Sequence, residues 1–317
     1  MLVITIGCVP KDDNSKNKDE ITGTEGLTIE FIKNFPQDNY VVSENEREPI
    51  SVILNVRNKG AFPKQDNLKL LADGKIYLSG FDDEIIEIDR SSKSLSTYFL
   101  PGVSSINLVG GFDTVEFEDG RIIAKNILVD RYEPVILATI CYPYQTIAGP
   151  SVCVDPFPFD ENQDKVCRIS SQTLTSQGAP VAVTRIDEEA SSNKIRFKIT
   201  IKNVGNGDVI KLGALGKCDP TVGQVLERGD FDRVELKKAM LGSVNLLHNC
   251  GPFAEGENNI IRLFEGEGYV ICSLDKSEFG DAKSAYTTPL NIELSYGYRS
   301  TASKQIRILK VTELTQE

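Results

Sequence analysis

Residues 195–205 read IRFKITIKNVG, and this stretch decides the fold class. Apolar and polar side chains alternate from Ile195 to Ile201, which is the period-two pattern of a strand with one buried face. The pattern ends at an Asn-x-Gly turn, Asn203 to Gly205, where both residues tolerate a left-handed backbone. Similar alternations bounded by turn formers, such as SVILNV at 51–56, predict an all-β protein built from sandwiches.

This stretch has a counterpart earlier in the chain. VRNKG at 56–60 recurs as IKNVG at 201–205, an offset of 145 residues, and ICYPYQTIA at 140–148 recurs as LSYGYRSTA at 294–302, an offset of 154. A tandem duplication explains both matches, and chance agreement between β-rich segments is the alternative. Superposition of the halves should therefore place the first member of each pair on the second: Asn58 on Asn203, Gly60 on Gly205, Tyr142 on Tyr296, and Tyr144 on Tyr298.

We therefore expect two tandem Ig-like β-sandwich domains with insertions, spanning 27–165 and 166–317, and at most one or two short helices. Residues 231–247 carry a rough helical stripe of apolar side chains, but two strands around Gly242 fit the same pattern. The Tyr-x-Tyr pairs place two rings on one face of a strand, where packing inside the sandwich is favoured over an exposed aromatic platform.

Residues 49–60, PISVILNVRNKG, resemble the opening strand of CARDB-like and related Ig-like domains that recur in prokaryotic envelope proteins. Residues 194–205 repeat this pattern, and PVAV at 180–183 resembles the strand before it. The resemblance implies a non-catalytic module in an envelope or surface assembly. By the same likeness, the whole chain is similar to archaeal surface proteins.

The N-terminus begins MLVITIGC and continues into a polar segment, 11–26. An apolar stretch ending in Gly-Cys before a polar tether resembles the end of a lipoprotein signal peptide, which implies that Cys8 carries a lipid anchor. Seven residues without Lys or Arg are short for a signal, and a start further upstream would explain this. We therefore expect 1–26 to be a truncated signal and a disordered tether; an edge strand at 2–7 is the alternative.

Six cysteines remain when Cys8 is set aside, and no C-x-x-C occurs among them. This pattern indicates disulfides formed in an oxidising compartment rather than a zinc site. Cys141 and Cys153 correspond to Ser295 and Arg307 under the 154-residue offset, and a turn at 148–150 would bring them together in a hairpin. We therefore expect a Cys141–Cys153 disulfide, with two further pairs among the remaining cysteines: Cys167, Cys218, Cys250 and Cys272.

The composition also excludes several classes of function. The 46 acidic and 35 basic residues give a net charge of −11, which argues against a nucleic-acid partner. No apolar run reaches the length of a membrane-spanning helix. One histidine, His248, lies near Cys250, but a disulfide is the simpler role for that cysteine. GALGKC at 213–218 lacks the first glycine and the Ser or Thr of a P-loop, so we expect no catalytic or cofactor-binding residues.

Calcium is the one cofactor that the sequence raises. Asp160, Asn162 and Asp164 supply oxygen side chains at alternate positions, as the start of an EF-hand loop does. Lys165 and Ser171 stand where an EF-hand needs Gly and Glu, so the segment is not an EF-hand. A solvated acidic linker between the domains is the alternative.

These observations favour a non-catalytic structural or adhesive protein outside the cytoplasm, held at the membrane or envelope through Cys8. Its expected partners are other envelope or surface proteins, self-assembly included. One alternative is a receptor for a sugar or peptide, which would need a concave aromatic or acidic pocket. The other is a hydrolase with scattered carboxylates, which would need a pair of them about 5 to 9.5 Å apart.

Overall fold

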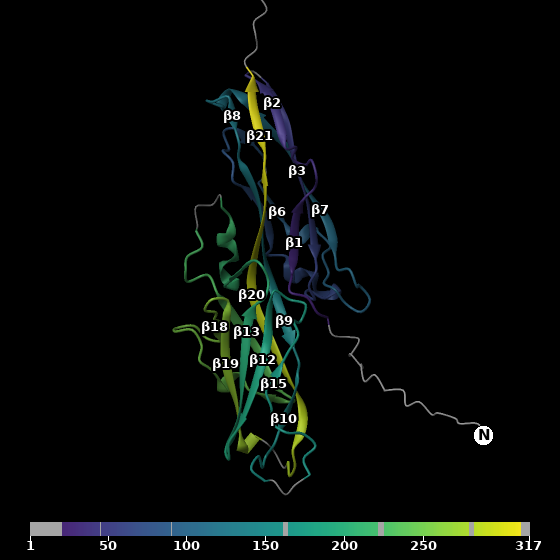
Figure 1. The fold of residues 1–317 in the computed structure, drawn as a ribbon, viewed down its shortest axis with the longest axis vertical. Coiled ribbons are helices and arrows are strands. Elements are labelled where there is room, and N and C mark those ends of the chain that lie inside the picture. The colour runs from purple at the N-terminus through teal and green to yellow at the C-terminus, as the bar shows by residue number, and fades with distance from the viewer. Residues whose placement is uncertain are drawn as a thin grey trace, which may run out of the picture.

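The computed structural model describes residues 21–44, 46–89, 91–160, 164–220, 225–278 and 282–311. They form an elongated, all-β molecule whose main strands run along its length (Figure 1). Within these ranges the helical structure consists of short 3-10 segments: η1 (Gln65–Leu71), η2 (Leu95–Thr97), η3 (Ala124–Asn126), η4 (Leu212–Cys218), η5 (Leu247–Asn249) and η6 (Lys276–Glu278). None of them is long and apolar enough to cross a membrane.

Each half contributes a sheet of its own. In the first half the strand order is β1 (Leu27–Phe31), β3 (Arg47–Asn58), β7 (Phe112–Ile123) and β5 (Ile86–Glu87). In the second half it is β11 (Gln172–Thr173), β12 (Val181–Ala190), β13 (Lys194–Asn203), β19 (Glu267–Asp275) and β17 (Cys250–Gly251). A small sheet of β2 (Asn39–Ser43), β21 (Arg307–Val311) and β8 (Arg131–Tyr132) forms one tip of the molecule (Figure 1).

A nine-stranded sheet joins the halves. Its order is β16 (Val244–Asn245), β15 (Arg233–Leu241), β20 (Tyr286–Gln305), β9 (Val135–Ala148), β4 (Lys75–Ser79) and β6 (Ser92–Ser94). Three more strands attach to it: β10 (Ser151–Val154), β14 (Asp208–Ile210) and β18 (Ile260–Arg262). The antiparallel pair β9–β20 lies at its centre, so strands of both halves share one backbone hydrogen-bond ladder.

One continuous apolar core accompanies this shared sheet, since a single cluster of buried side chains contains residues from both halves. The division into domains near residue 165 stays a prediction. Whatever the boundary, the halves are joined by strand pairing rather than by a free linker.

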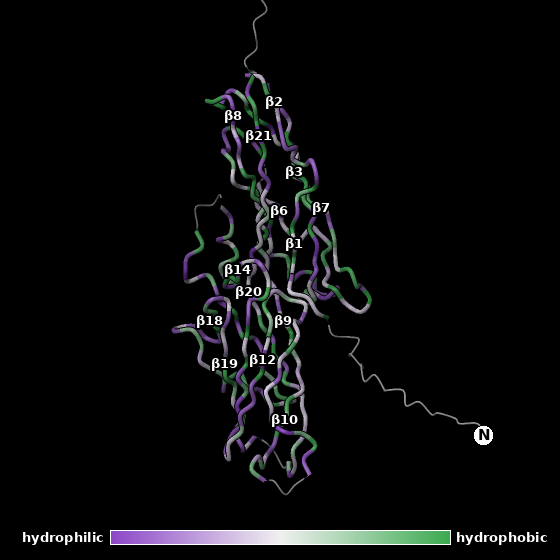
Figure 2. Tube along the Cα trace, viewed as in Figure 1, coloured by the Kyte–Doolittle hydropathy of each residue, from purple (hydrophilic) through white to green (hydrophobic). Residues whose placement is uncertain are grey.

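The alternation read from the sequence matches the strands that form. In β13, Ile195, Phe197, Ile199 and Ile201 are buried, while the residues between them face outward. Figure 2 shows the resulting change between hydrophobic and hydrophilic positions along the strands. This is the period of a strand with one face on the core.

Residues 231–247 form strands rather than a helix. β15 and β16 pair as a hairpin around Gly242, which has a φ of +55°. Glycine accepts this left-handed conformation without the steric cost of a Cβ, so the local turn overrides the rough helical stripe.

The predicted disordered tether is wrong in its last six residues. The backbone N–H of Gly23 donates to Ser176 Oγ at 3.0 Å, and the Gly23 carbonyl accepts from Ala179. The Gly26 carbonyl accepts from Lys59, whose ammonium pairs with Glu25 at 3.2 Å. Residues 21–26 are therefore held between the two halves by backbone hydrogen bonds that their polar composition does not reveal; residues 1–20 lie outside the described part.

Candidate functional site

Four tyrosines meet at the centre of the β9–β20 ladder. Tyr142 lies opposite Tyr298, and Tyr144 lies opposite Tyr296, all on the face turned toward the core. Their ring centroids are 5.7 to 6.4 Å apart across the cluster, in the tilted and edge-to-face arrangements that aromatic rings prefer. Burial raises the pKa of all four phenols, so the cluster stays neutral at physiological pH.

Each tyrosine hydroxyl binds backbone at an equivalent place in its half. Tyr142 Oη accepts from the N–H of Leu27 at 3.0 Å, and Tyr296 Oη accepts from the N–H of Val181 at 3.3 Å. Leu27 begins β1 and Val181 begins β12, and they differ by the same 154 residues as the two tyrosines (181 − 27 and 296 − 142). The rings therefore fix the start of the equivalent strand in each half.

The Asn-x-Gly landmarks also occupy equivalent places. Leu27 pairs with Asn58, and Val181 pairs with Asn203. The side-chain amide of Asn58 donates to the carbonyl four residues on, that of Phe62, and Asn203 does the same to Gly207. The backbone N–H groups of these two acceptors donate in turn to Tyr144 Oη and Tyr298 Oη.

The glycines of these landmarks serve close approach rather than a left-handed turn. Neither Gly60 nor Gly205 has a positive φ. A Cβ on Gly60 would lie 1.9 Å from Tyr144 Oη, and one on Gly205 would lie 2.4 Å from Tyr298 Oη. The expectation of a left-handed backbone at these positions is wrong, because what excludes a side chain is the tyrosine hydroxyl.

The predicted Cys141–Cys153 disulfide is wrong. The described residues contain three disulfides: Cys141–Cys218, Cys153–Cys167 and Cys250–Cys272. Of the four cysteines expected to pair among themselves, only Cys250 and Cys272 do so. Both other disulfides cross residue 165, the expected domain boundary.

The error comes from the interpretation of residues 148–150 as a hairpin turn. Ala148 pairs with Ile292 and Ser151 pairs with Pro289, so β10 continues along β20 in the same register as β9. An extended chain advances about 3.3 Å per residue, which separates Cys141 from Cys153 by about 40 Å along the strand. Such a separation is far beyond the reach of a disulfide.

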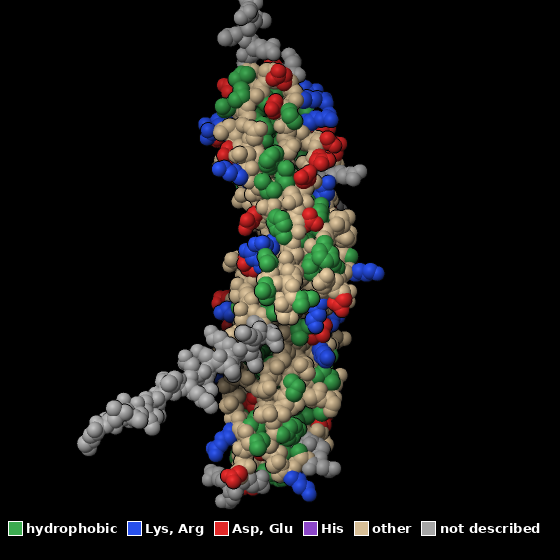
Figure 3. Space-filling view, turned by 90° about the vertical axis from the view of Figure 1, so that its right-hand side faces the viewer, with side chains coloured by type: hydrophobic (Ala, Val, Ile, Leu, Met, Phe, Trp, Pro, Cys, Tyr) green, Lys and Arg blue, Asp and Glu red, His purple; other side chains and the backbone are tan. Residues whose placement is uncertain are grey.

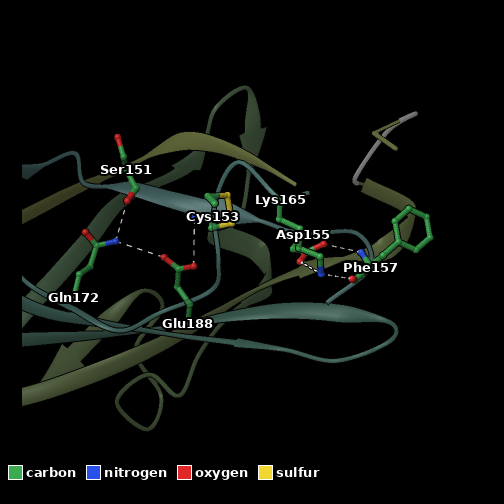
Figure 4. The surroundings of a disulfide bond; sticks show 8 residues. Ser151, Cys153, Asp155, Phe157, Lys165, Gln172 and Glu188 are labelled. Carbon is green, nitrogen blue, oxygen red and sulfur yellow. Dashed lines mark hydrogen bonds and ion pairs between the residues drawn. A yellow bond between two sulfur atoms is a disulfide. The ribbon is translucent and has the colours of Figure 1, made fainter. Parts of the chain in front are cut away.

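The Cys153–Cys167 disulfide has polar surroundings near the end of the molecule away from β21 (Figures 1 and 4). The N–H of Cys153 donates to Glu188 Oε2 at 3.3 Å, and the amide of Gln172 donates to Glu188 Oε1 at 3.4 Å. Burial raises the pKa of Glu188 to about 7, although both hydrogen bonds act to lower it. The carboxyl of Glu188 therefore changes charge near neutral pH beside the disulfide.

An ion pair closes the loop between the two cysteines. Lys165 Nζ lies 2.7 Å from Asp155 Oδ2, and it also donates to the carbonyl of Phe157 at 2.7 Å (Figure 4). Both charged side chains are at most 10% exposed. Lys165, which breaks the EF-hand pattern in the sequence, thus neutralises a carboxylate of this loop.

The calcium hypothesis for this loop stays a prediction. Asn162 lies outside the described residues, while Asp160 and Asp164 lie within them. In the described ranges, no group of three or more His, Cys, Asp or Glu residues is placed to hold a metal ion.

The opposite face of the β9–β20 ladder carries a groove of about 550 Å³. Its floor includes Gln145 and Ser295, which are paired across the two strands. Residues of η1 and η4 line its sides, and two lysines, Lys69 and Lys75, line it as well. This groove was not predicted from the sequence, in which its one signal is the glycine-rich run at 213–218 that becomes part of η4.

The remaining sequence candidates have structural places. Cys250 is bonded to Cys272, so it is not available as a nucleophile for His248. Cys218, at the end of the glycine-rich run, is bonded to Cys141. Cys8, the expected lipid site, lies outside the described residues. The expectation that the chain is not an enzyme stays a prediction.

No family model matches the chain, and no curated protein matches it. Among solved structures, the chain is similar to the C-terminal domain of the Streptococcus pyogenes antigen I/II-family protein AspA, with 8% sequence identity and a TM-score of 0.18. The similarity covers 90% of this chain and 100% of that one. This score is too low to indicate a shared fold. The three disulfides among the described residues of this chain fit a β-rich protein that folds outside the reducing cytosol.

Proposed function

We propose that the protein is a non-catalytic structural or adhesive module of the cell envelope, held at the membrane through a lipid on Cys8. The observation that carries the proposal is the disulfide between Cys141 of β9 and Cys218 of η4, which ties the halves together beside the shared ladder. Strand pairing and a covalent bond across the same junction favour a rod that keeps its shape under load.

The surface supports this role. Figure 3 shows one long face of the molecule, on which basic, acidic and apolar side chains are interspersed along the length. This face does not gather cations in the way that a nucleic-acid-binding face does. Mixed charge of this kind suits a module that meets other proteins of the envelope.

The test combines localisation with anchoring. Intact cells that express the full native reading frame are treated with a protease that cannot cross membranes, and the protein is then followed in membrane and soluble fractions. We expect cleavage on intact cells, an N-terminal peptide heavier by an acyl-sized increment, and release from the membrane fraction in Cys8→Ser. Protection from the protease in intact cells, together with an unmodified Cys8, would contradict the proposal.

The groove over β9 and β20 favours a second function, which is to bind a ligand. A rod-shaped structural protein can also have this function.

A further inference from the structure

The floor of the groove carries polar groups without protein partners. Neither the hydroxyl of Ser295 nor the side-chain amide of Gln145 makes a hydrogen bond to another described residue, and neither group is sealed from solvent, since Ser43 Oγ is the one fully buried side-chain polar atom without a partner in the described ranges. Polar groups that are open to solvent bind water, and a ligand that replaces this water must supply hydrogen bonds of its own. The two adjacent polar side chains at the bottom of the groove are therefore free to bind a ligand that supplies both a donor and an acceptor.

The sides of the groove are apolar and open. Leu70 of η1 is 43% exposed, and Leu212 and Leu215 of η4 line the other side. Gly213 and Gly216, also in the lining, have no heavy atom within 4 Å of the position that a Cβ would occupy. An extended chain can therefore approach η4 closely and place an apolar side chain against the leucines.

The charges at the groove favour an anion. Lys69 and Lys75 are exposed, and the side-chain ammonium of neither forms an ion pair or hydrogen bond with another described residue. One carboxylate, Asp73, accompanies them in the lining, so the groove carries net positive charge in a chain whose net charge is −11. This local excess complements a carboxylate on the ligand.

A sugar fits the lining less well than a peptide. The aromatic residues of the lining, Phe62 and Tyr144, are 9% and 0% exposed, so neither presents a ring face for stacking. An extended peptide, in contrast, has backbone N–H and C=O groups for Ser295 and Gln145 and side chains for the leucines and lysines.

We propose that this groove binds an extended peptide segment of a partner protein, in which a Glu or Asp lies beside a large apolar residue. The backbone of the segment hydrogen-bonds to Gln145 and Ser295, its apolar side chain packs against Leu70 and Leu215, and its carboxylate pairs with Lys69 or Lys75. The proposal concerns recognition only and holds whether or not the protein is lipid-anchored.

The test uses fluorescein-labelled tetrapeptides on the purified disulfide-bonded protein. Acetyl-Leu-Glu-Leu-Glu-amide should bind weakly, with a Kd of about 0.1 mM, as expected for a short flexible ligand. Acetyl-Leu-Gln-Leu-Gln-amide should bind at least about 5-fold more weakly, and acetyl-Leu-Lys-Leu-Lys-amide should not bind measurably. The side-chain amide resonances of Gln145 should shift on titration with the acidic peptide.

Variants locate the binding to the groove. Gly213→Phe fills the groove from a position where a Cβ meets no atom, so it should fold and abolish binding. Lys69→Glu and Lys75→Glu should each weaken binding of the acidic peptide by about 5-fold or more. Lys33→Glu, at an exposed lysine outside the groove lining, is the matched control and should leave binding unchanged. Equal binding of the acidic and basic peptides, or binding that survives Gly213→Phe, would overturn the proposal.

Discussion

Pro143 and Gly297 face each other across the β9–β20 ladder, and a twofold exchange of the two strands about this pair preserves the register of the ladder. Exchange of β9 and β20 moves Tyr142 onto Tyr296 and Tyr144 onto Tyr298, which keeps the offset of 154 residues found in the sequence. The tyrosines from which the sequence repeat was predicted are thus the residues that meet where β9 pairs with β20. The same aromatic cluster therefore serves as core for both halves.

The close contacts at the two landmark glycines predict costly alanine variants. Gly60→Ala places a Cβ 1.9 Å from Tyr144 Oη and 2.5 Å from the carbonyl oxygen of Glu25, so a backbone segment must move. We expect a loss of about 3 kcal/mol in the free energy of unfolding, and a somewhat smaller loss for Gly205→Ala, whose nearest contact is 2.4 Å. Urea denaturation of the oxidised protein measures both.

The matched control is Gly229→Ala, because a Cβ at Gly229 meets no atom within 4 Å. Its free energy of unfolding should stay within about 0.5 kcal/mol of the parent. A Gly60→Ala protein as stable as this control would show that the approach of Tyr144 to Gly60 is not part of the folded state.

The tyrosine hydroxyls predict a second pair of matched variants. Tyr142→Phe leaves the N–H of Leu27 without its partner at a buried site, and Tyr296→Phe does the same to the N–H of Val181, while the hydroxyl of Thr146 keeps its bond to the Val181 carbonyl. Each should cost about 1 to 3 kcal/mol in the free energy of unfolding, with the ring packing kept. Because the two sites are equivalent, their losses should agree within about 1 kcal/mol. A large loss at one site alone would mean that only one half depends on its tyrosine.

Local signals in the sequence were sufficient for the strands and for the equivalence of the landmarks. The alternation in the sequence of β13 predicts the strand correctly, because one face of the strand is buried and the other is not. The role of the glycines was misread, since Asn-x-Gly indicates a turn in isolation, whereas here the glycine makes room for a tyrosine from another strand.

The disulfides and the groove could not be read from the sequence, because both depend on contacts between distant strands. An Ala-Gly-Pro run at 148–150 predicts a turn, but pairing with β20 carries the chain straight through it. Likewise, nothing local to Gln145 and Ser295 shows that they lie side by side, since register between strands 150 residues apart (295 − 145) is set by the whole sheet.

The titration of Glu188 predicts a pH dependence of stability. The pKa of this carboxyl is about 7 in the folded protein, against an ordinary value of 4.5. A raised pKa means that folding favours the protonated form, so the stability it contributes is complete below pH 4.5 and is lost as the pH rises to about 7. Glu188→Gln, which stays neutral, should remove this decline and exceed the parent by about 1 kcal/mol above pH 7, a value reduced for the half-exposed position.

Thermal melts between pH 4 and 8.5 measure this difference. Glu189→Gln removes a charge from the adjacent, exposed position of β12 and serves as the control. A parent and a Glu188→Gln protein whose midpoints change in parallel across this range would contradict a raised pKa at Glu188.

The disulfide connectivity predicts a ranking of stabilities. In the chain-entropy description, a disulfide stabilises more as the loop it closes lengthens. Cys141–Cys218 spans 77 residues, Cys250–Cys272 spans 22, and Cys153–Cys167 spans 14, which corresponds to about 4.5, about 3.5 and about 3 kcal/mol. Replacing both cysteines of a pair by alanine should therefore cost most at Cys141–Cys218, where the loss also frees η4 from β9.

Urea denaturation of the three double variants gives the ranking, and peptide mapping without reduction gives the pairs. A Cys141–Cys153 peptide in that map, or a Cys141→Ala/Cys218→Ala protein more stable than the other two, would show that the junction between the halves is not closed in this way.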